Sequence, residues 1–177
     1  MALTQGARIK IKSIVQSAKK LLMKEFESQL QQYYGIRPDG SCLLVEELTS
    51  REASVIETAR LLRQRLHYLE EGIAGNDKAP EAVRQLVREQ AFTILNRFAA
   101  VRMSEERNII RESIRKVYNS EGFLVYDQLT GGARTAEQFT RYNWYIGHVF
   151  NELAIDLPAV FDRFSPYALL FPSEKVL

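Results

Sequence analysis

Apolar residues recur three and four positions apart along most of this chain, and that spacing constrains the fold more than any other feature. Between Thr4 and Tyr34 the apolar positions are Ile11, Ile14, Val15, Ala18, Leu21, Leu22, Phe26, Leu30 and Tyr33. This is the spacing of one face of an amphipathic α-helix. Gly35 and Pro38 end the pattern, so residues 35–41 are predicted to form a turn or a loop.

Two further helices follow from the same spacing. Thr49 and Glu52 stand at the positions of a capping box, which predicts that a second helix begins near Thr49. Its apolar stripe alternates between steps of four and three residues, which suits packing against another long helix: Val55, Ala59, Leu62, Leu66 and Leu69. A third helix is predicted from about Pro80 to Met103, since proline suits a first helical turn.

The rest of the chain is interrupted more often. Ser104, Glu105 and Glu106 favour a new helix start, and that fourth helix is predicted to run to Val117. Residues 123–126 are predicted to be a short strand or an apolar plug. Thr135 and Gln138 repeat the capping spacing before a fifth helix of about twenty residues. The predicted fold is therefore an all-α, multi-helix bundle of long amphipathic helices, with a short extended segment near 123–126.

Length and composition limit the domain organisation and the compartment. The chain has 177 residues, which fits a single helical domain over 1–177, or a helical hairpin over 1–75 followed by a helical core over 76–177. Every apolar run is far shorter than the roughly 20 residues of a membrane span, so no membrane contact is expected. The single cysteine, Cys42, excludes an internal disulfide. These features predict a cytoplasmic protein.

Positive charge is concentrated in two blocks. Residues 1–34 carry six Lys or Arg against two Glu, and residues 76–120 carry nine against six acidic residues. In the second block, Arg107, Arg111 and Arg115 recur every four residues beside Lys116, so they would share one face of the predicted fourth helix. Such a face could neutralise DNA phosphates. The alternative is a solvated face, paired in part with carboxylates of Glu106 and Glu112.

Two other arginines lie on or beside the apolar arc of the predicted third helix. Arg102 falls inside the arc, and Arg97 lies at its edge. An arginine on an apolar side needs a carboxylate or carbonyl partner, because an unpaired buried charge is prohibitively costly. Glu105 and Glu106 are near enough to serve. We therefore expect Arg97, Arg102, Glu105 and Glu106 to organise a helix junction; a direct DNA contact is the alternative.

No complete active site is recognisable in the sequence. The two histidines, His67 and His148, do not stand in a metal-ligand spacing, and no phosphate-binding or nucleophile motif occurs. An aromatic cluster lies on the predicted fifth helix: Phe139, Tyr142, Trp144, Tyr145 and Phe150. Aromatic side chains can stack on exposed bases, but at helical spacing they are more often part of a core. Catalytic, cofactor-binding and metal-binding residues are therefore not assigned to this chain.

One segment carries a resemblance to a known family. The string ILNRFAAVRMSEERNII (Ile94–Ile110) resembles the "N-R-apolar-x-x-R/K-apolar-x-E" segment of the N-terminal helical region of large DNA adenine-N6 methyltransferases. These are restriction-modification enzymes and the methyltransferases of BREX-type phage-defence systems. The tail LPAVFDRFSPYALLFPSEKVL (Leu157–Leu177) is similar to the stretch that follows in the BREX-like branch.

The resemblance implies an N-terminal domain that supports a catalytic domain acting on double-stranded DNA with S-adenosylmethionine. The family's Asn/Asp-Pro-Pro-Tyr/Phe motif and glycine-rich cofactor loop are absent, since no two of the five prolines are adjacent. We therefore expect the catalytic domain to lie outside this chain. The alternative function is a helical module that docks a partner subunit of a defence system through the Val55–Leu69 stripe or the aromatic helix.

Overall fold

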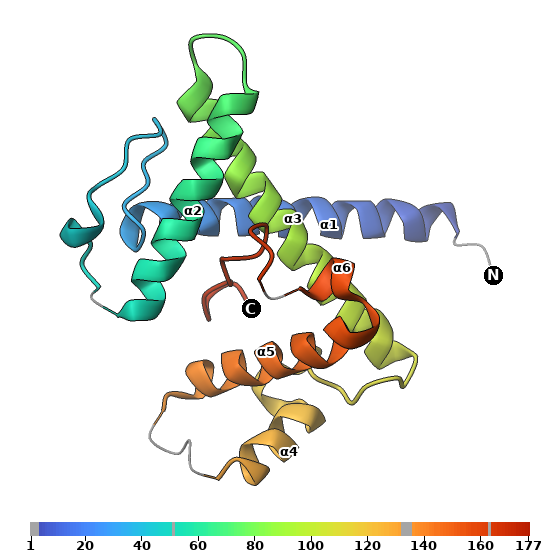
Figure 1. Cartoon of the computed structure of the whole chain (residues 1–177). Helices are drawn as coiled ribbons and strands as arrows, with labels where there is room; N and C mark the ends of the chain where they lie inside the picture. The colour runs from blue at the N-terminus through green and yellow to red at the C-terminus, as the bar shows by residue number, and fades with distance from the viewer. Residues whose placement is uncertain (1–3, 51, 132–135, 163) are drawn as a thin grey trace. The chain divides into compact units, whose positions relative to one another are not determined.

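The computed structural model describes residues 4–50, 52–131, 136–162 and 164–177, and the regular elements among them are helices (Figure 1). The described part has no β-strand beyond an isolated bridge between Ile36 and Cys42. The elements are α1 (Gln5–Gln32), η1 (Val45–Glu47), α2 (Ala53–Gly72), α3 (Lys78–Glu106), η2 (Val117–Asn119), α4 (Glu121–Leu129), α5 (Gln138–Asp156) and α6 (Pro158–Phe161). The predicted all-α fold class is confirmed.

The chain divides into two compact units. The first is Met1–Phe92 with Pro166–Val176, and the second is Thr93–Ser165 with Leu177. Helix α3 therefore gives its first half to one unit and its second half to the other. The sequence placed the alternative subdivision at residue 75, in the turn before α3, whereas these units divide inside the helix.

The first unit has a core built from the predicted apolar stripes. The α2 stripe is buried at Ala59, Leu62, Leu66 and Leu69, as expected. It shares that core with the last three turns of α1 and the first half of α3. The predicted start of α2 is wrong: the helix begins at Ala53, and its N-cap residue, Glu52, makes no side-chain capping bond.

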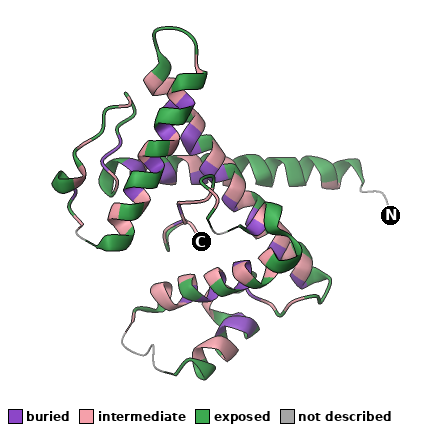
Figure 2. Cartoon of the chain, in the orientation of Figure 1, coloured by how far each residue is buried: buried purple, intermediate pink, exposed green. Residues whose placement is uncertain are grey.

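Only the C-terminal half of α1 joins this core. Leu22, Phe26 and Leu30 are buried, whereas the apolar residues of the preceding turns are exposed. Figure 2 shows this contrast along α1, which is green over its N-terminal turns and partly purple towards its C-terminus. The amphipathic stripe of the sequence is thus longer than the surface that the first unit covers.

Two glutamines attach the C-terminal segment to the first unit. The amide of Gln29 in α1 donates to the main-chain carbonyl of Phe171 at 2.9 Å. Gln90 in α3 is fully buried and bonds main-chain atoms of residues 166–170. Because buried polar groups are stable only when hydrogen-bonded, these amides fix the course of a segment that has no α-helix of its own.

The second unit is organised by aromatic side chains. Tyr142, Tyr145 and Phe150 of α5 are buried, and Phe123 of α4 stacks edge-on against Tyr142 with ring centroids 5.3 Å apart. The core reading of the aromatic cluster therefore holds for these residues, while Trp144 is half exposed. Of the two alternatives predicted for residues 123–126, the short strand is wrong, because these residues lie in α4.

The fifth predicted helix is present as α5, with 19 residues. Its expected capping residue, Thr135, lies outside the described residues. Across the described part of the chain, none of the helices combines the length and apolar character that crossing a membrane requires.

Candidate functional site

The predicted cationic helix face does not exist, because the helix that should carry it is absent. Helix α3 continues without a break through Ser104 and ends at Glu106. Residues 107–116 then form an irregular loop, which we call the arginine loop. Arg107, Arg111 and Arg115 consequently do not recur on one side of a helix.

Glu105 anchors the arginine loop instead of starting a helix. Its side chain is buried, and one carboxylate oxygen accepts hydrogen bonds from the main-chain N–H groups of Ser113 and Ile114, both at 2.6 Å. The other oxygen is paired with the guanidinium of Arg102. A buried carboxylate with both a charge partner and amide donors is strongly held, so it fixes the loop against the end of α3.

Hydroxyl groups from α5 hold the same point of the loop. Ser113 Oγ lies 2.5 Å from the hydroxyl of Tyr145, and the hydroxyl of Tyr142 donates to the Ser113 carbonyl at 3.0 Å. Burial raises the pKa of both tyrosines above the ordinary value. The loop is therefore pinned from two directions at residue 113.

The loop closes on a strained residue. Val117 has a φ of +47°, in the left-handed region that a β-branched residue rarely adopts. Such a conformation costs about 1–3 kcal/mol and persists only where the surroundings over-determine it. Strained residues are concentrated at functional sites, which draws attention to the loop that Val117 ends.

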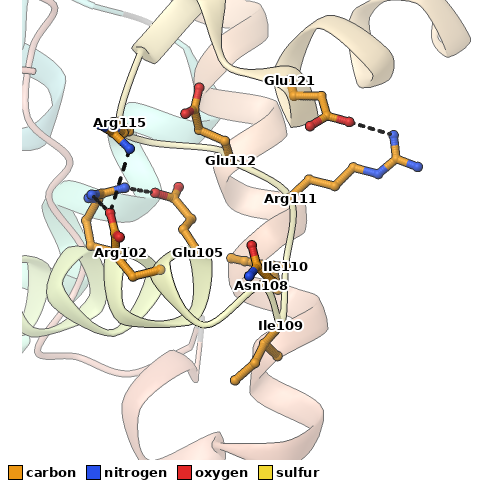
Figure 3. Close-up of a pocket in the computed structure, with 10 residues that line it drawn as sticks. Arg102, Glu105, Asn108, Ile109, Ile110, Arg111, Glu112, Arg115 and Glu121 are labelled. Atoms are coloured by element: carbon orange, nitrogen blue, oxygen red, sulfur yellow. Dashed lines mark hydrogen bonds and ion pairs between the residues drawn. The ribbon is translucent and has the colours of Figure 1, made fainter.

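A pocket of about 480 Å³ opens between the end of α3, the arginine loop and the start of α4. Figure 3 shows its lining residues, with Arg102 and Arg115 on one side and Arg111 directed away from them towards Glu121. The lining residues are Arg102, Glu105, Glu106, Asn108, Ile109, Ile110, Arg111, Glu112, Arg115 and Glu121. With three arginines and four glutamates, the pocket is a mixed-charge surface and does not form a purely cationic cradle.

The cations at its rim are paired loosely. Arg111 lies 3.7 Å from a carboxylate oxygen of Glu121, and Arg115 lies 4.0 Å from one of Glu106, with about 62% of each arginine side chain exposed. Exposed pairs of this kind contribute about 0–1 kcal/mol. An incoming phosphate could therefore replace these carboxylates at little cost. Lys116 is similarly exposed, 3.1 Å from Glu112.

The two arginines expected at a helix junction are placed differently from each other. Arg97 is buried and donates to main-chain carbonyls of Val160, at 2.9 Å, and Asp162, at 2.6 Å, so its partners are not Glu105 and Glu106. Arg102 is only partly buried and pairs with Glu105 and Glu106. Arg97 ties α3 to the end of α6, and neither guanidinium is directed freely into solvent.

The surroundings of the pocket offer no recognisable catalytic group. His67 is exposed beside Glu71, and His148 packs against Tyr126 with ring centroids 5.3 Å apart; neither lines the pocket. Among the described residues, no group of His, Cys, Asp and Glu side chains could hold a metal ion. The arrangement can bind charged groups at its rim.

Sequence reasoning missed Gln90 and Ser113. Gln90 falls inside the apolar arc of α3, and a polar amide in that position was the signal that could have revealed it. Nothing local marks Ser113, because its partners come from residues 105, 142 and 145.

Comparison with known proteins identifies no relative of this chain. No protein-family model, curated protein or solved structure matches this chain. The resemblance of residues 94–110 to adenine methyltransferases therefore stays a prediction that rests on its motif.

Proposed function

We propose that this chain is a helical domain of a DNA adenine-N6 methyltransferase of restriction-modification or phage-defence type, and that its arginine loop contacts the DNA backbone. The observation that supports this most is the set of exposed cations in one anchored loop: Arg107, Arg111, Arg115 and Lys116. Phosphate contacts come from such exposed cations, and they position a protein on DNA without reading its sequence.

The charge balance makes this a weak, supporting contact. Glu105 is already neutralised by Arg102 inside the pocket, which leaves four cations of the loop against Glu106, Glu112 and Glu121 at the rim. The loop and its rim therefore carry a net charge of about +1, which is enough to contact a few phosphates. In this proposal a catalytic domain supplies the rest of the affinity for DNA. In this proposal the loop helps to orient that domain on double-stranded DNA.

The cofactor belongs to the catalytic domain in this proposal. S-adenosylmethionine would donate the methyl group there. No chemical step is assigned to the residues of this chain.

Binding of the 177-residue chain to a fluorescent DNA duplex tests the contact. At 50 mM salt, R107E/R111E should weaken binding roughly tenfold and reduce the slope of log K against log salt by about two. The matched control is R60E/K78E, which reverses two exposed cations of the first unit. Equal losses in both variants, or none in R107E/R111E, would contradict a contact at the loop.

The parent activity has its own test. The gene's reading frame beyond codon 177, or an adjacent gene, should encode an Asn/Asp-Pro-Pro-Tyr/Phe motif, and the protein or complex should methylate adenine in duplex DNA. Absence of the motif from both places would sink the methyltransferase proposal and leave the DNA-contact measurement intact.

A second candidate is a module that docks a partner subunit. The α2 stripe is buried within its own unit, and so is much of the aromatic helix, so neither surface is free for this role. What favours the candidate is the uncovered N-terminal half of α1, and salt-insensitive binding to a protein without DNA retention would distinguish it.

A further inference from the structure

The N-terminal half of α1 is an amphipathic helix whose apolar side is left largely uncovered by the first unit. Its exposed apolar residues form a stripe along one face, which we call the α1 stripe: Ile11, Ile14, Val15, Ala18 and Leu21. All of them are exposed except Ala18, which is half-buried. The stripe continues in register into Leu22 and Phe26, which the first unit buries.

This half of α1 lacks the local propensity to be stable by itself. Three isoleucines and a valine are β-branched, and Gly6, Ser13 and Ser17 are also weak helix formers. Most helical stability in proteins comes from packing of the apolar face, and isolated helices of this length are marginal in water. We therefore expect another surface to pack on the α1 stripe and stabilise this half of the helix.

Charge restricts what that surface can be. Residues 4–24 contain six cations and no Asp or Glu: Arg8, Lys10, Lys12, Lys19, Lys20 and Lys24. At 100° per residue, Lys12 borders one edge of the stripe and Lys10 lies beside the other, while Lys19, on the same edge as Lys12, has its ammonium over the Phe92 ring at 4.3 Å. A second copy of this helix would bring like charges together, so the occupant must be anionic as well as apolar.

The residue types favour a protein helix over a lipid surface or a nucleic acid. Residues 11, 15, 18 and 22 alternate between steps of four and three, which is the pattern of helix-on-helix packing. Residues 5–25 contain no aromatic side chain, whereas helices that lie in a membrane interface commonly carry Trp or Phe. DNA phosphates would meet the lysines but would leave the isoleucines uncovered.

We propose that the α1 stripe docks an amphipathic helix of a partner protein, with acidic residues on that helix facing the flanking lysines. This commits the second candidate function to a place and a partner chemistry. It is independent of the DNA contact at the arginine loop, which lies in the other unit.

The test uses a synthetic acidic helix of about 21 residues, with Leu and Ile at its a and d positions and Glu at e and g. The full chain should bind it, and a scrambled peptide of the same composition should not bind. I14S should weaken binding about tenfold, because it removes an isoleucine that the bound helix would bury. I9S is the matched control: Ile9 is 63% exposed and Ile14 62%, but Ile9 points away from the stripe.

A second matched pair tests the charges. K12E, at the edge of the stripe, should weaken binding more than K20E on the far side, and added salt should reduce the difference. The proposal is overturned if the scrambled peptide binds equally, or if I14S and I9S behave alike. It is also overturned if vesicles of phosphatidylcholine with 30% phosphatidylserine bind through Ile14 while the peptide does not.

Use of the stripe within the chain's own fold would also overturn the proposal. In that case I14S would lower the melting temperature by several degrees more than I9S, and the peptide would not bind. Loss of peptide binding would leave DNA binding by the arginine loop unchanged, so the two proposals fail separately.

Discussion

The side-chain amide of Gln90 donates a hydrogen bond of 2.8 Å to the main-chain carbonyl of Pro166, across 76 positions of the sequence. The carbonyl oxygen of the same amide accepts from the main-chain N–H of Leu169 at 2.7 Å and of Leu170 at 3.2 Å. One fully buried side chain thus satisfies three main-chain groups of the C-terminal segment. We expect this amide to be a main determinant of where that segment packs.

Replacement of Gln90 by alanine should lower the free energy of unfolding by about 2–4 kcal/mol, because it leaves buried donors and an acceptor unsatisfied. Urea denaturation of the full chain measures this. Gln31→Ala is the control, since Gln31 is exposed and bonds only the nearby Glu27 carbonyl, at 3.3 Å; it should stay within about 0.5 kcal/mol of wild type. Similar losses in both variants would contradict the role of Gln90.

Two glycines in the second unit should respond oppositely to alanine. A Cβ on Gly122 would lie 3.0 Å from the carbonyl oxygen of Glu112 and closer still to the Tyr145 hydroxyl, so G122A should cost about 1–3 kcal/mol. A Cβ on Gly147, inside α5, would meet nothing within 4 Å, so G147A should stabilise by about 0.5–1 kcal/mol. Thermal melts of both variants measure the effect, and a stabilised G122A would refute the close approach of α4 and α5.

Neutralising Glu105 should release the arginine loop. In E105Q the amide loses the charge that pairs with Arg102 and that strengthens the bonds to Ser113 and Ile114, so the main-chain amides of these residues should exchange their hydrogens faster. Hydrogen exchange followed by mass spectrometry measures this. E106Q removes an exposed partner of Arg102 and should leave the loop protected; equal exchange in the two variants would argue against the anchor.

Stability should fall at alkaline pH because of the buried tyrosines. Burial raises the pKa of Tyr142 and Tyr145 above the ordinary value of 10.0, so the folded state keeps protons that the unfolded state releases. The contribution of these two tyrosines to the free energy of unfolding is therefore constant below pH 10, and it declines as the pH rises above 10. Melting temperatures between pH 8 and 11.5 should show this decline, and Y142F should reduce its slope more than Y68F, which alters an exposed ring.

Helical spacing predicted the fold class because each long helix buries one face, and the apolar residues of that face can be recognised within a short stretch of sequence. The Ala59–Leu69 stripe and α5 are examples. The end of α3 was mispredicted because an acidic pair after a serine is also the pattern of a helix start. Glu105 instead meets Ser113, Ile114 and Arg102, and only the folded chain brings the first two of these close.

The candidate site shows the same limit. Spacing placed Arg107, Arg111 and Arg115 on one face, but this inference depended on a helix that the loop replaces. The turn at Asn108, with a φ of +56°, is closed by local bonds: its N–H donates to the Glu105 carbonyl at 2.9 Å, and the Ile109 N–H donates to the Ser104 carbonyl at 3.0 Å. Asparagine is one of the residues that commonly end a helix in this way, so this local signal for the end of α3 was present in the sequence. For α1 the stripe was correctly recognised, but its length gave no indication that half of it would remain uncovered.

The continuity of α3 bears on how this protein folds. The 29 residues Lys78–Glu106 form one helix, yet its two halves are buried in different cores. Helix formation is limited by its first turn, and later turns add at little cost. Once residues 78–92 have become helical against α1 and α2, the second half of α3 can extend from an existing helix end and needs no nucleation event of its own. During synthesis from the N-terminus these residues are made early, whereas the segment Pro166–Val176 that completes the first unit is made last.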